Sequence, residues 1–236
     1  AYEILTCDWS SDVCSSDLHR IGWLCRIGAI LILLGLCAQT ALNEPFGLAT
    51  VAAAPHDRWS AIWMRLGYDI AADLAAVARC RTESVSCGSP AAQRFIGLVD
   101  HGAPYQGFDR IRHINRAVNL TLRIREQPAW TSPLAALAAG EGDCKQYAAI
   151  KYAAMLDGGF APDDVRLIVG SIPPGTGHAV VAVRSAGIWF ILDNRSLDVV
   201  RSEAFAAFTP LYAFDSRGVR RFAPPVAELP GQPCAG

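Results

Sequence analysis

The chain has 236 residues, 52% of them hydrophobic, and its formal net charge at pH 7 is only -1. This length and composition are enough for one domain with a sizeable core, and they exclude a disordered chain. No cluster of Lys and Arg stands out as a surface for phosphate, so we expect no nucleic-acid partner.

Residues 1–18 do not have the texture of a folded segment. They carry the near-repeat Ser10-Ser11-Asp12-Val13-Cys14-Ser15-Ser16-Asp17-Leu18 and resemble translated sequencing-adapter sequence joined to an open reading frame. We therefore expect a non-native extension here and exclude it from the fold.

Residues 19–41 have the order of an export signal. Arg20 and Arg26 flank the start of an apolar run, Ile27–Leu36, and small residues follow it. A run of about ten apolar residues is too short to span a bilayer as a helix, which needs about 20. We therefore expect a signal peptide, with a buried core helix as the alternative. The mature domain then covers residues 42–236 and is periplasmic or secreted.

Four cysteines remain after residue 41, namely Cys80, Cys87, Cys144 and Cys234. Cys80 and Cys87 bracket a short polar stretch between two helical patterns, so a disulfide between them would close a small loop. In an oxidising compartment we expect this bond, worth about 2–3 kcal/mol by chain entropy, and two unpaired thiols are the alternative.

The first two thirds of this domain read as helices. Apolar residues recur at three- and four-residue steps in 57–78, and shorter helical patterns follow in 90–99 and 108–120. Ser132 and Pro133 then offer a cap and a first-turn proline for a helix over 134–139. A Gly-rich break at 140–143 ends this helix, and a new helical pattern runs from Cys144 to Leu156.

After residue 164 the pattern changes: apolar and polar residues alternate, and β-branched residues become frequent. This predicts strands over Val165–Val169, His178–Val183, Ile188–Asp193 and, more weakly, Leu211–Phe214. Helices followed by strands indicate an α+β domain in which N-terminal helices pack on an antiparallel sheet. A doubly wound α/β fold would instead alternate the two.

Cys144 is predicted to begin a helix, where backbone N–H groups and the helix dipole favour a thiolate over a thiol. The preceding Gly140-Glu141-Gly142-Asp143 leaves room for a substrate carbonyl, and the Cys144 N–H could donate to an oxyanion. A buried structural thiol, or a disulfide to Cys234, is the alternative.

His178 and Asp193 are the candidate general base and the carboxylate that orients it. A hairpin centred on Ser185-Ala186 would place them directly opposite each other on one face of two paired strands. A one-residue slip or bulge would make the pairing diagonal or put the two residues on opposite faces of the sheet.

The other histidines lack such a partner, and we interpret His56, His101 and His113 as surface or capping residues. Neither a C-x-x-C pair nor an H-E-x-x-H helix is present, which argues against zinc. We expect no cofactor.

At these residues the sequence resembles the bacterial transglutaminase-like cysteine proteinases, which include the LapG-like periplasmic proteases that cut surface adhesins. The similarity covers nearly all of the chain after residue 41. It is carried by Glu44-Pro45-Phe46-Gly47, Trp130, Pro133-Leu134, Gly142-Asp143-Cys144, Tyr147-Ala148, Lys151-Tyr152, His178-Ala179-Val180 and Leu192-Asp193-Asn194.

The resemblance implies a papain-like transglutaminase fold, a triad of Cys144, His178 and Asp193, and hydrolysis of peptide bonds. It also implies a surface adhesin as substrate and an inner-membrane receptor as regulatory partner. Relatives commonly have an acidic pair after the cysteine, whereas this chain has Lys145 and Gln146. Because Ca²⁺ needs six to eight oxygen ligands, we expect activity without calcium.

Two other functions use the same residues or the same fold. A transglutaminase or amidase would form the same acyl-enzyme and differ only in whether an amine or water accepts the acyl group. A non-catalytic module would instead bind an exported peptide in the cleft, without chemistry at Cys144.

Overall fold

The computed structural model describes residues 44–54, 57–82 and 87–223, which belong to one compact unit, Asn43–Gly236. The expected extension at 1–18, the expected signal peptide, His56 and Cys234 lie outside the described residues.

Helices come first along the chain. A 3₁₀ turn at Pro45–Gly47 (η1) and a short strand, Thr50–Ala52 (β1), precede the helices Arg58–Thr82 (α2), Pro90–Asp100 (α3), Gly107–Asn119 (α4), Pro133–Ala139 (α5) and Cys144–Asp157 (α6). Each predicted helix is present and matches its predicted range to within a few residues. The caps agree as well, since Ser132 Oγ accepts the Ala135 N–H and Pro133 occupies the first turn of α5.

The sheet follows the helices. Its strands are Val165–Ile172 (β4), Thr176–Ser185 (β5), Ile188–Leu192 (β6), Val200–Arg201 (β7), Thr209–Asp215 (β8) and Gly218–Phe222 (β9), with 3₁₀ turns at Pro162–Asp164 (η2) and Ser202–Ala204 (η3). The order is β1-β9-β8-β4-β5-β6-β7, and every pairing in this sheet is antiparallel. A separate two-stranded ladder joins Arg123–Ile124 (β2) to Glu141–Gly142 (β3). The predicted α+β class is therefore confirmed.

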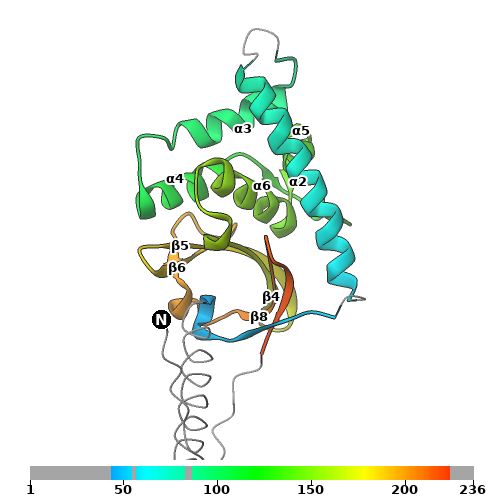
Figure 1. Cartoon of the computed structure of the whole chain (residues 1–236), viewed down its shortest axis with the longest axis vertical. Coiled ribbons are helices and arrows are strands. Elements are labelled where there is room, and N and C mark those ends of the chain that lie inside the picture. Colours follow the sequence, from blue (N-terminus) through cyan, green and yellow to red (C-terminus); the bar gives the residue numbers. More distant parts are fainter. Residues whose placement is uncertain (1–43, 55–56, 83–86, 224–236) are drawn as a thin grey trace, which may run out of the picture. The chain divides into compact units, whose positions relative to one another are not determined.

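Helices cover one face of this curved sheet (Figure 1). Alternate β5 residues face the two sides: Ala179, Val181 and Val183 pack in the larger core, whereas Val180 and Ala182 belong to a smaller core. Burial on both faces explains why β5 reads as an unbroken apolar run.

α6 lies at the centre of the larger core, and every residue from Gln146 to Met155 is buried. A helix that is buried all round needs apolar residues on every side. Cys144 stands at its N-terminal end, so the helix that carries the thiol is held firmly by its surroundings.

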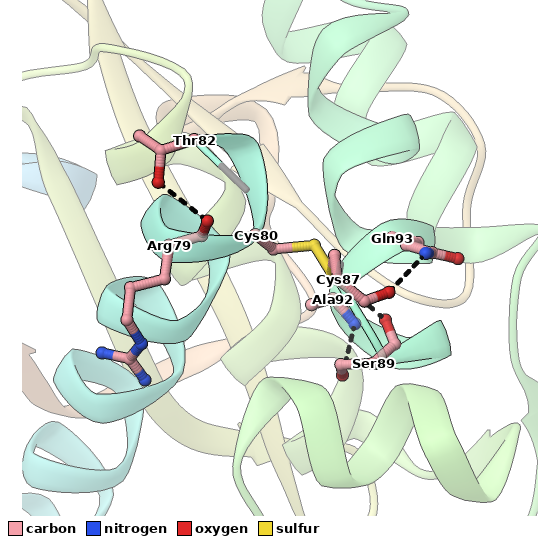
Figure 2. The surroundings of a disulfide bond; sticks show 7 residues. All are labelled: Arg79, Cys80, Thr82, Cys87, Ser89, Ala92 and Gln93. Atoms are coloured by element: carbon pink, nitrogen blue, oxygen red, sulfur yellow. Dashed lines mark hydrogen bonds between the residues drawn. A yellow bond between two sulfur atoms is a disulfide. The ribbon is translucent and has the colours of Figure 1, made fainter. Parts of the chain in front are cut away.

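The predicted disulfide between Cys80 and Cys87 is present, with their Cα atoms 4.9 Å apart. It joins the end of α2 to the residues before α3, where Ser89 caps α3 through the Ala92 N–H and Gln93 donates to the Cys87 carbonyl (Figure 2). The bond thus fixes the connection between the first two long helices.

Candidate active site

Cys144 is the first residue of α6 and carries a free, partly buried thiol. Gly140, in the left-handed conformation at φ 68°, ends α5, and Asp143 caps α6. The predicted helix N-terminus is therefore confirmed.

A capping box fixes the chain around the thiol. Asp143 Oδ1 accepts the Lys145 N–H at 3.0 Å, and Gln146 Oε1 accepts the Asp143 N–H at 3.2 Å. Gln146 also donates to the Ala129 carbonyl at 2.8 Å. Such reciprocal bonds satisfy donors that a helix start leaves unpaired. Among the described residues, no acceptor takes the Cys144 N–H, which leaves it free to donate to a substrate oxygen.

His178 and Asp193 form a buried pair. His178 Nε2 lies 2.9 Å from Asp193 Oδ1, and both side chains are 5% exposed. Because Nε2 faces the carboxylate, Nδ1 is the imidazole nitrogen left for the thiol.

Asp193 is held ionised by several donors. Burial raises its pKa, but hydrogen bonds from His178 and Arg195 outweigh that effect and bring the pKa well below its usual range. Arg195 donates from Nη2 at 2.6 Å and from Nε at 2.9 Å to Oδ2, and its backbone N–H reaches Oδ1 at 3.0 Å. The carboxylate is thus fixed on both oxygens.

The thiol and the imidazole interact. Burial lowers the pKa of His178, yet hydrogen bonds with Asp193 and Cys144, and the charges of both groups, raise it to about 9. These interactions favour the protonated imidazole, the partner that a thiolate needs.

The predicted hairpin register is wrong. The turn is Ala186-Gly187, with φ of 49° and 78°, so that Ser185 pairs with Ile188 and Val181 with Leu192. Positive φ at both positions matches the right-handed twist of paired strands, and Gly187 is the residue of this turn that fits the usual sequence preference. Continued past Leu192, this register would bring Arg195, not Asp193, opposite His178.

Asp193 nevertheless reaches His178, because side chains alternate between the two faces of a strand. An offset of two residues keeps both on the same side, and diagonal neighbours lie within reach of long side chains. The pairing is therefore diagonal, as expected for a slipped register.

Sequence reasoning missed Arg195, whose only signal was a cation two residues after Asp193. It also missed Asn115 and Asn119 of α4, which hold the loop that carries Asp193. Asn119 Nδ2 donates to the carbonyls of Asp193 and Ser196, at 2.8 and 2.7 Å. Asn115 Nδ2 donates to the Ser196 and Leu197 carbonyls, both at 3.1 Å.

A glycine lets an aromatic ring pack beside the histidine. Gly170 pairs with His178 across β4 and β5, and a Cβ there would lie 2.6 Å from Phe208 Cζ and would overlap the Thr209 carbonyl oxygen. The Phe208 and His178 rings are 6.3 Å apart in an edge arrangement. Gly170 thus permits the close approach that encloses the imidazole.

The remaining described histidines lie outside this cluster. His101 is the C-cap of α3, and His113 stacks on Tyr105 with ring centroids 5.2 Å apart. Among the described residues, no three His, Cys, Asp or Glu side chains gather in a way that could hold a metal.

A cavity of about 720 Å³ lies between α2 and residues 128–135, and Leu66, Asp69, Asp73 and Trp130 help to line it. Cys144, His178 and Asp193 do not line it, so it is not the reaction centre. The cavity and the reaction centre are connected through the segment that follows Gln127 and lines the cavity, because the Gln127 N–H binds Asp143 Oδ2 at 2.8 Å.

Within the part of the chain that the structure describes, no helix has both the length and the apolarity to cross a membrane.

Comparison with known proteins gives one family and one fold. The family model described as bacterial transglutaminase-like cysteine proteinase BTLCP matches residues 71–208. No curated protein matches the chain. Among solved structures, LapG of Legionella pneumophila has a TM-score of 0.53 at 22% identity, over 61% of this chain and 87% of LapG.

Two further structures of the same protein agree. LapG described as EGTA-treated has a TM-score of 0.53 and LapG described as calcium-bound has one of 0.50, both at 21% identity. Both cover 61% of this chain, and 84% and 87% of theirs. At this identity the likeness shows a shared fold, which is transglutaminase-like.

Proposed function

This chain belongs to the bacterial transglutaminase-like cysteine proteinases and is a cysteine peptidase, and we propose that Cys144, His178 and Asp193 carry its reaction. Cys144 is the nucleophile, His178 the general base and acid, and Asp193 the group that orients the imidazole.

One observation carries this assignment: a free thiol at a helix start interacts with a buried histidine that is held by an ionised carboxylate. A nucleophile, a base within reach of it and a third group that orients the base are what covalent acyl transfer requires. Outside this cluster, the described residues bring no second histidine to a free cysteine.

In the acylation step, the Cys144 sulfur attacks the peptide carbonyl and forms a tetrahedral intermediate. The Cys144 N–H donates to the oxyanion, because it points out of the first turn of α6. The intermediate collapses as His178 transfers its Nδ1 proton to the leaving amine. The Asp193 bond to Nε2 keeps Nδ1 directed at the reacting atoms.

In the deacylation step, water attacks the thioester while the now neutral His178 accepts a proton at Nδ1. The second tetrahedral intermediate releases the carboxylic acid and restores the thiolate and imidazolium pair. Both steps depend on the same imidazole orientation, so Asp193 contributes to each.

The test is a search for new N-termini. The envelope proteins of the organism that encodes this chain are incubated with wild-type protein or with Cys144→Ala, and the newly formed N-termini are labelled and sequenced. Cleavage sites that appear only with the wild type support the peptidase. Equal cleavage by Cys144→Ala would overturn the assignment.

Acyl transfer to an amine is the second candidate function, since it shares the acyl-enzyme. A glutamine peptide and a labelled primary amine distinguish the two, because stable incorporation of the label favours transfer over hydrolysis. A non-catalytic binding module is the third candidate. Failure of Cys144 to react with a thiol-directed probe would favour it.

For location and substrate, we propose a periplasmic or secreted enzyme that processes a cell-surface protein such as a large adhesin, under control of an inner-membrane receptor. The signal-like segment at 19–41 and the family resemblance support this proposal. Fractionation of cells that express the full chain tests the location. A very large repetitive surface protein, or a membrane receptor, encoded beside this chain would support the substrate and the partner.

For calcium, we propose that this chain works without it, although one LapG structure is described as calcium-bound. The cation next to Asp143 is the Lys145 ammonium, whose Nζ lies 2.7 Å from Oδ2. The backbone N–H groups of Gln127 and Lys145 bind the same carboxylate. Ca²⁺ favours several carboxylate oxygens, so these residues do not fit it.

A further inference from the structure

Lys151 is a buried lysine that the reaction described above does not use. It lies on α6, two turns after Cys144, and is 1% exposed. Its Nζ has no hydrogen-bond partner among the described residues. A buried ammonium without hydrogen-bond partners destabilises the folded state. We therefore expect Lys151 to serve a function that offsets this cost.

The choice of lysine is itself informative. The chain has 21 lysines and arginines, and only Lys145 and Lys151 are lysines. Both lie on the helix that begins with Cys144. Lysine can lose its proton when it is buried, whereas arginine stays charged, so the two are not interchangeable in this position.

Helix packing turns Lys151 towards α4. α4 runs antiparallel to α6, since Tyr147 Oη donates to the Leu122 carbonyl at 2.6 Å while a Cβ on Gly158 would lie 3.4 Å from Ile114 Cδ1. Residues four and seven apart share one face of a helix, so Lys151 faces α4 between these two contacts. On α4, the Asn119 amide binds the Asp193 carbonyl.

Three polar side chains on α4 and α6 each have a buried atom without a hydrogen-bond partner among the described residues. The Oδ1 atoms of Asn115 and Asn119 are buried acceptors that lack a partner among the described residues, as Lys151 Nζ is a donor that lacks one. The Nδ2 atoms of the two asparagines hold the loop of Asp193. Lys151 thus faces the helix whose asparagines position the Asp193 loop.

Asp193 is the charged group that acts on Lys151. Burial lowers the pKa of Lys151 to about 7, and the charge of Asp193 limits the fall. α4 contributes the neutral Asn115 and Asn119, and His178 of β5 binds Asp193. Other charged groups on α6 and on elements packed against it bind elsewhere: Arg81 to Asp100 and Asp157, Arg94 to the Leu137 carbonyl, Arg166 to Asp215, and Lys145 to Asp143.

We propose that Lys151 is a positioning residue that acts through Asp193, as a buried positive charge on the face of α6 that packs against α4, the helix that holds Asp193. The proposal rests on the proposed function of the Asp193–His178 pair. The charge of Lys151 stabilises the ionised carboxylate of Asp193, and it favours the ionised form of the Cys144 thiol. The site therefore gains a charge that is present in weakly acidic solution and is lost as the pH rises past neutrality.

The first test measures the coupling without any substrate. Protein labelled with ¹³C at the lysine ε-carbon gives two lysine signals, and Lys145→Arg assigns them. We expect the Lys151 signal to titrate at about pH 7, and its midpoint to fall in Asp193→Asn, because the carboxylate that raises it is gone. An unchanged midpoint in Asp193→Asn, or titration near the ordinary lysine range, would overturn the proposal.

The second test measures the effect on the thiol through its alkylation by iodoacetamide. In Lys151→Met, which keeps the length of the side chain, the pH of half-maximal reactivity should rise by about half a unit, because a nearby positive charge favours the thiolate. The urea midpoint should not fall, since an apolar side chain replaces an unpaired charge.

An unchanged alkylation profile would overturn the role in the site, and a large fall in the urea midpoint would show a purely structural role. If Lys151→Met does not fold, the lysine titration still decides. Neither the lysine titration nor the alkylation profile depends on proteolysis. A failure of the peptidase assignment is therefore distinguishable, because in the N-terminal labelling test Cys144→Ala would then cleave like the wild type.

Discussion

His178 Nε2 and Asp193 Oδ1 meet at 2.9 Å although the two residues are offset by two positions in the strand register. The carboxylate is therefore held by its loop as much as by the sheet. Arg195 and Asn119 bind the side chain and the backbone of Asp193. The site is thus a small network rather than a pair of opposed strand residues.

We expect Cys144→Ala to abolish hydrolysis, because the covalent route is lost. His178→Ala should lose about 10²–10⁴-fold, the usual contribution of proton transfer. Asp193→Asn should fold and slow the chemical step, with about 10⁴-fold as an upper guide from serine-protease triads. The measurement is single-turnover kinetics on a substrate found by N-terminal labelling.

The three effects should be strongly non-additive, since groups that act as a unit cannot be removed twice. Circular dichroism serves as the folding control. Near wild-type activity of Asp193→Asn would reduce the triad to a cysteine and a histidine.

Stability should fall between about pH 6.5 and pH 9 because of His178. Its pKa is about 9 in the folded protein, against 6.5 for an unperturbed histidine, the value taken for the unfolded chain. Below 6.5 the group is protonated in both states and its full contribution is present, and the contribution is lost as the pH rises through 9. Urea unfolding at pH 6.5 and 9 should show a larger loss for the wild type than for His178→Gln. Equal losses would contradict the raised pKa.

Gly170→Ala should lower both stability and activity, because the added Cβ would overlap the Thr209 oxygen and the Phe208 ring. Phe208 would then move away from His178. Gly177→Ala is the matched control, since no atom lies within 4 Å of its Cβ position. Urea unfolding and the rate of Cys144 alkylation measure the two effects. If the two variants behaved alike, the packing of Phe208 would not matter to the site.

Loss of the Cys80–Cys87 disulfide should lower the free energy of unfolding by about 2–3 kcal/mol, the chain-entropy value for a loop of this size. The double variant Cys80→Ser/Cys87→Ser should keep the alkylation rate of Cys144, because the bond joins α2 to α3 and does not contact the site. Urea unfolding of oxidised wild type and of the variant gives the comparison. A loss of thiol reactivity in the folded variant would show that the bond shapes the active site.

Activity should survive calcium chelation, because the Lys145 ammonium rather than a metal lies against Asp143. The measurement is the rate of substrate cleavage before and after EGTA, with magnesium added back as the control for non-specific effects. A large loss that calcium alone restores would show that oxygen ligands come from other residues.

Local sequence determined the element types and identified the candidate site residues. Caps, glycine breaks and apolar spacing act over a few residues, and this is why five helices, the start of α6 and the Cys80–Cys87 loop could be predicted. The helix start pointed to Cys144, and the expected hairpin and the family resemblance pointed to His178 and Asp193 as candidates. The short strands β1 and β9 escaped because three to five residues, two of them Arg220 and Arg221, carry too weak a pattern.

Only the tertiary structure decided how these residues meet. The Ala186-Gly187 turn shifted the hairpin register, and Asp193 still reached His178 because a two-residue offset preserves the face. Arg195 and Asn119 became part of the site through contacts with Asp193. Burial in α6 left Lys151 without a hydrogen-bond partner among the described residues. Such roles depend on the distance between segments remote in the chain and on exclusion from water, and neither quantity is encoded in local residue spacing.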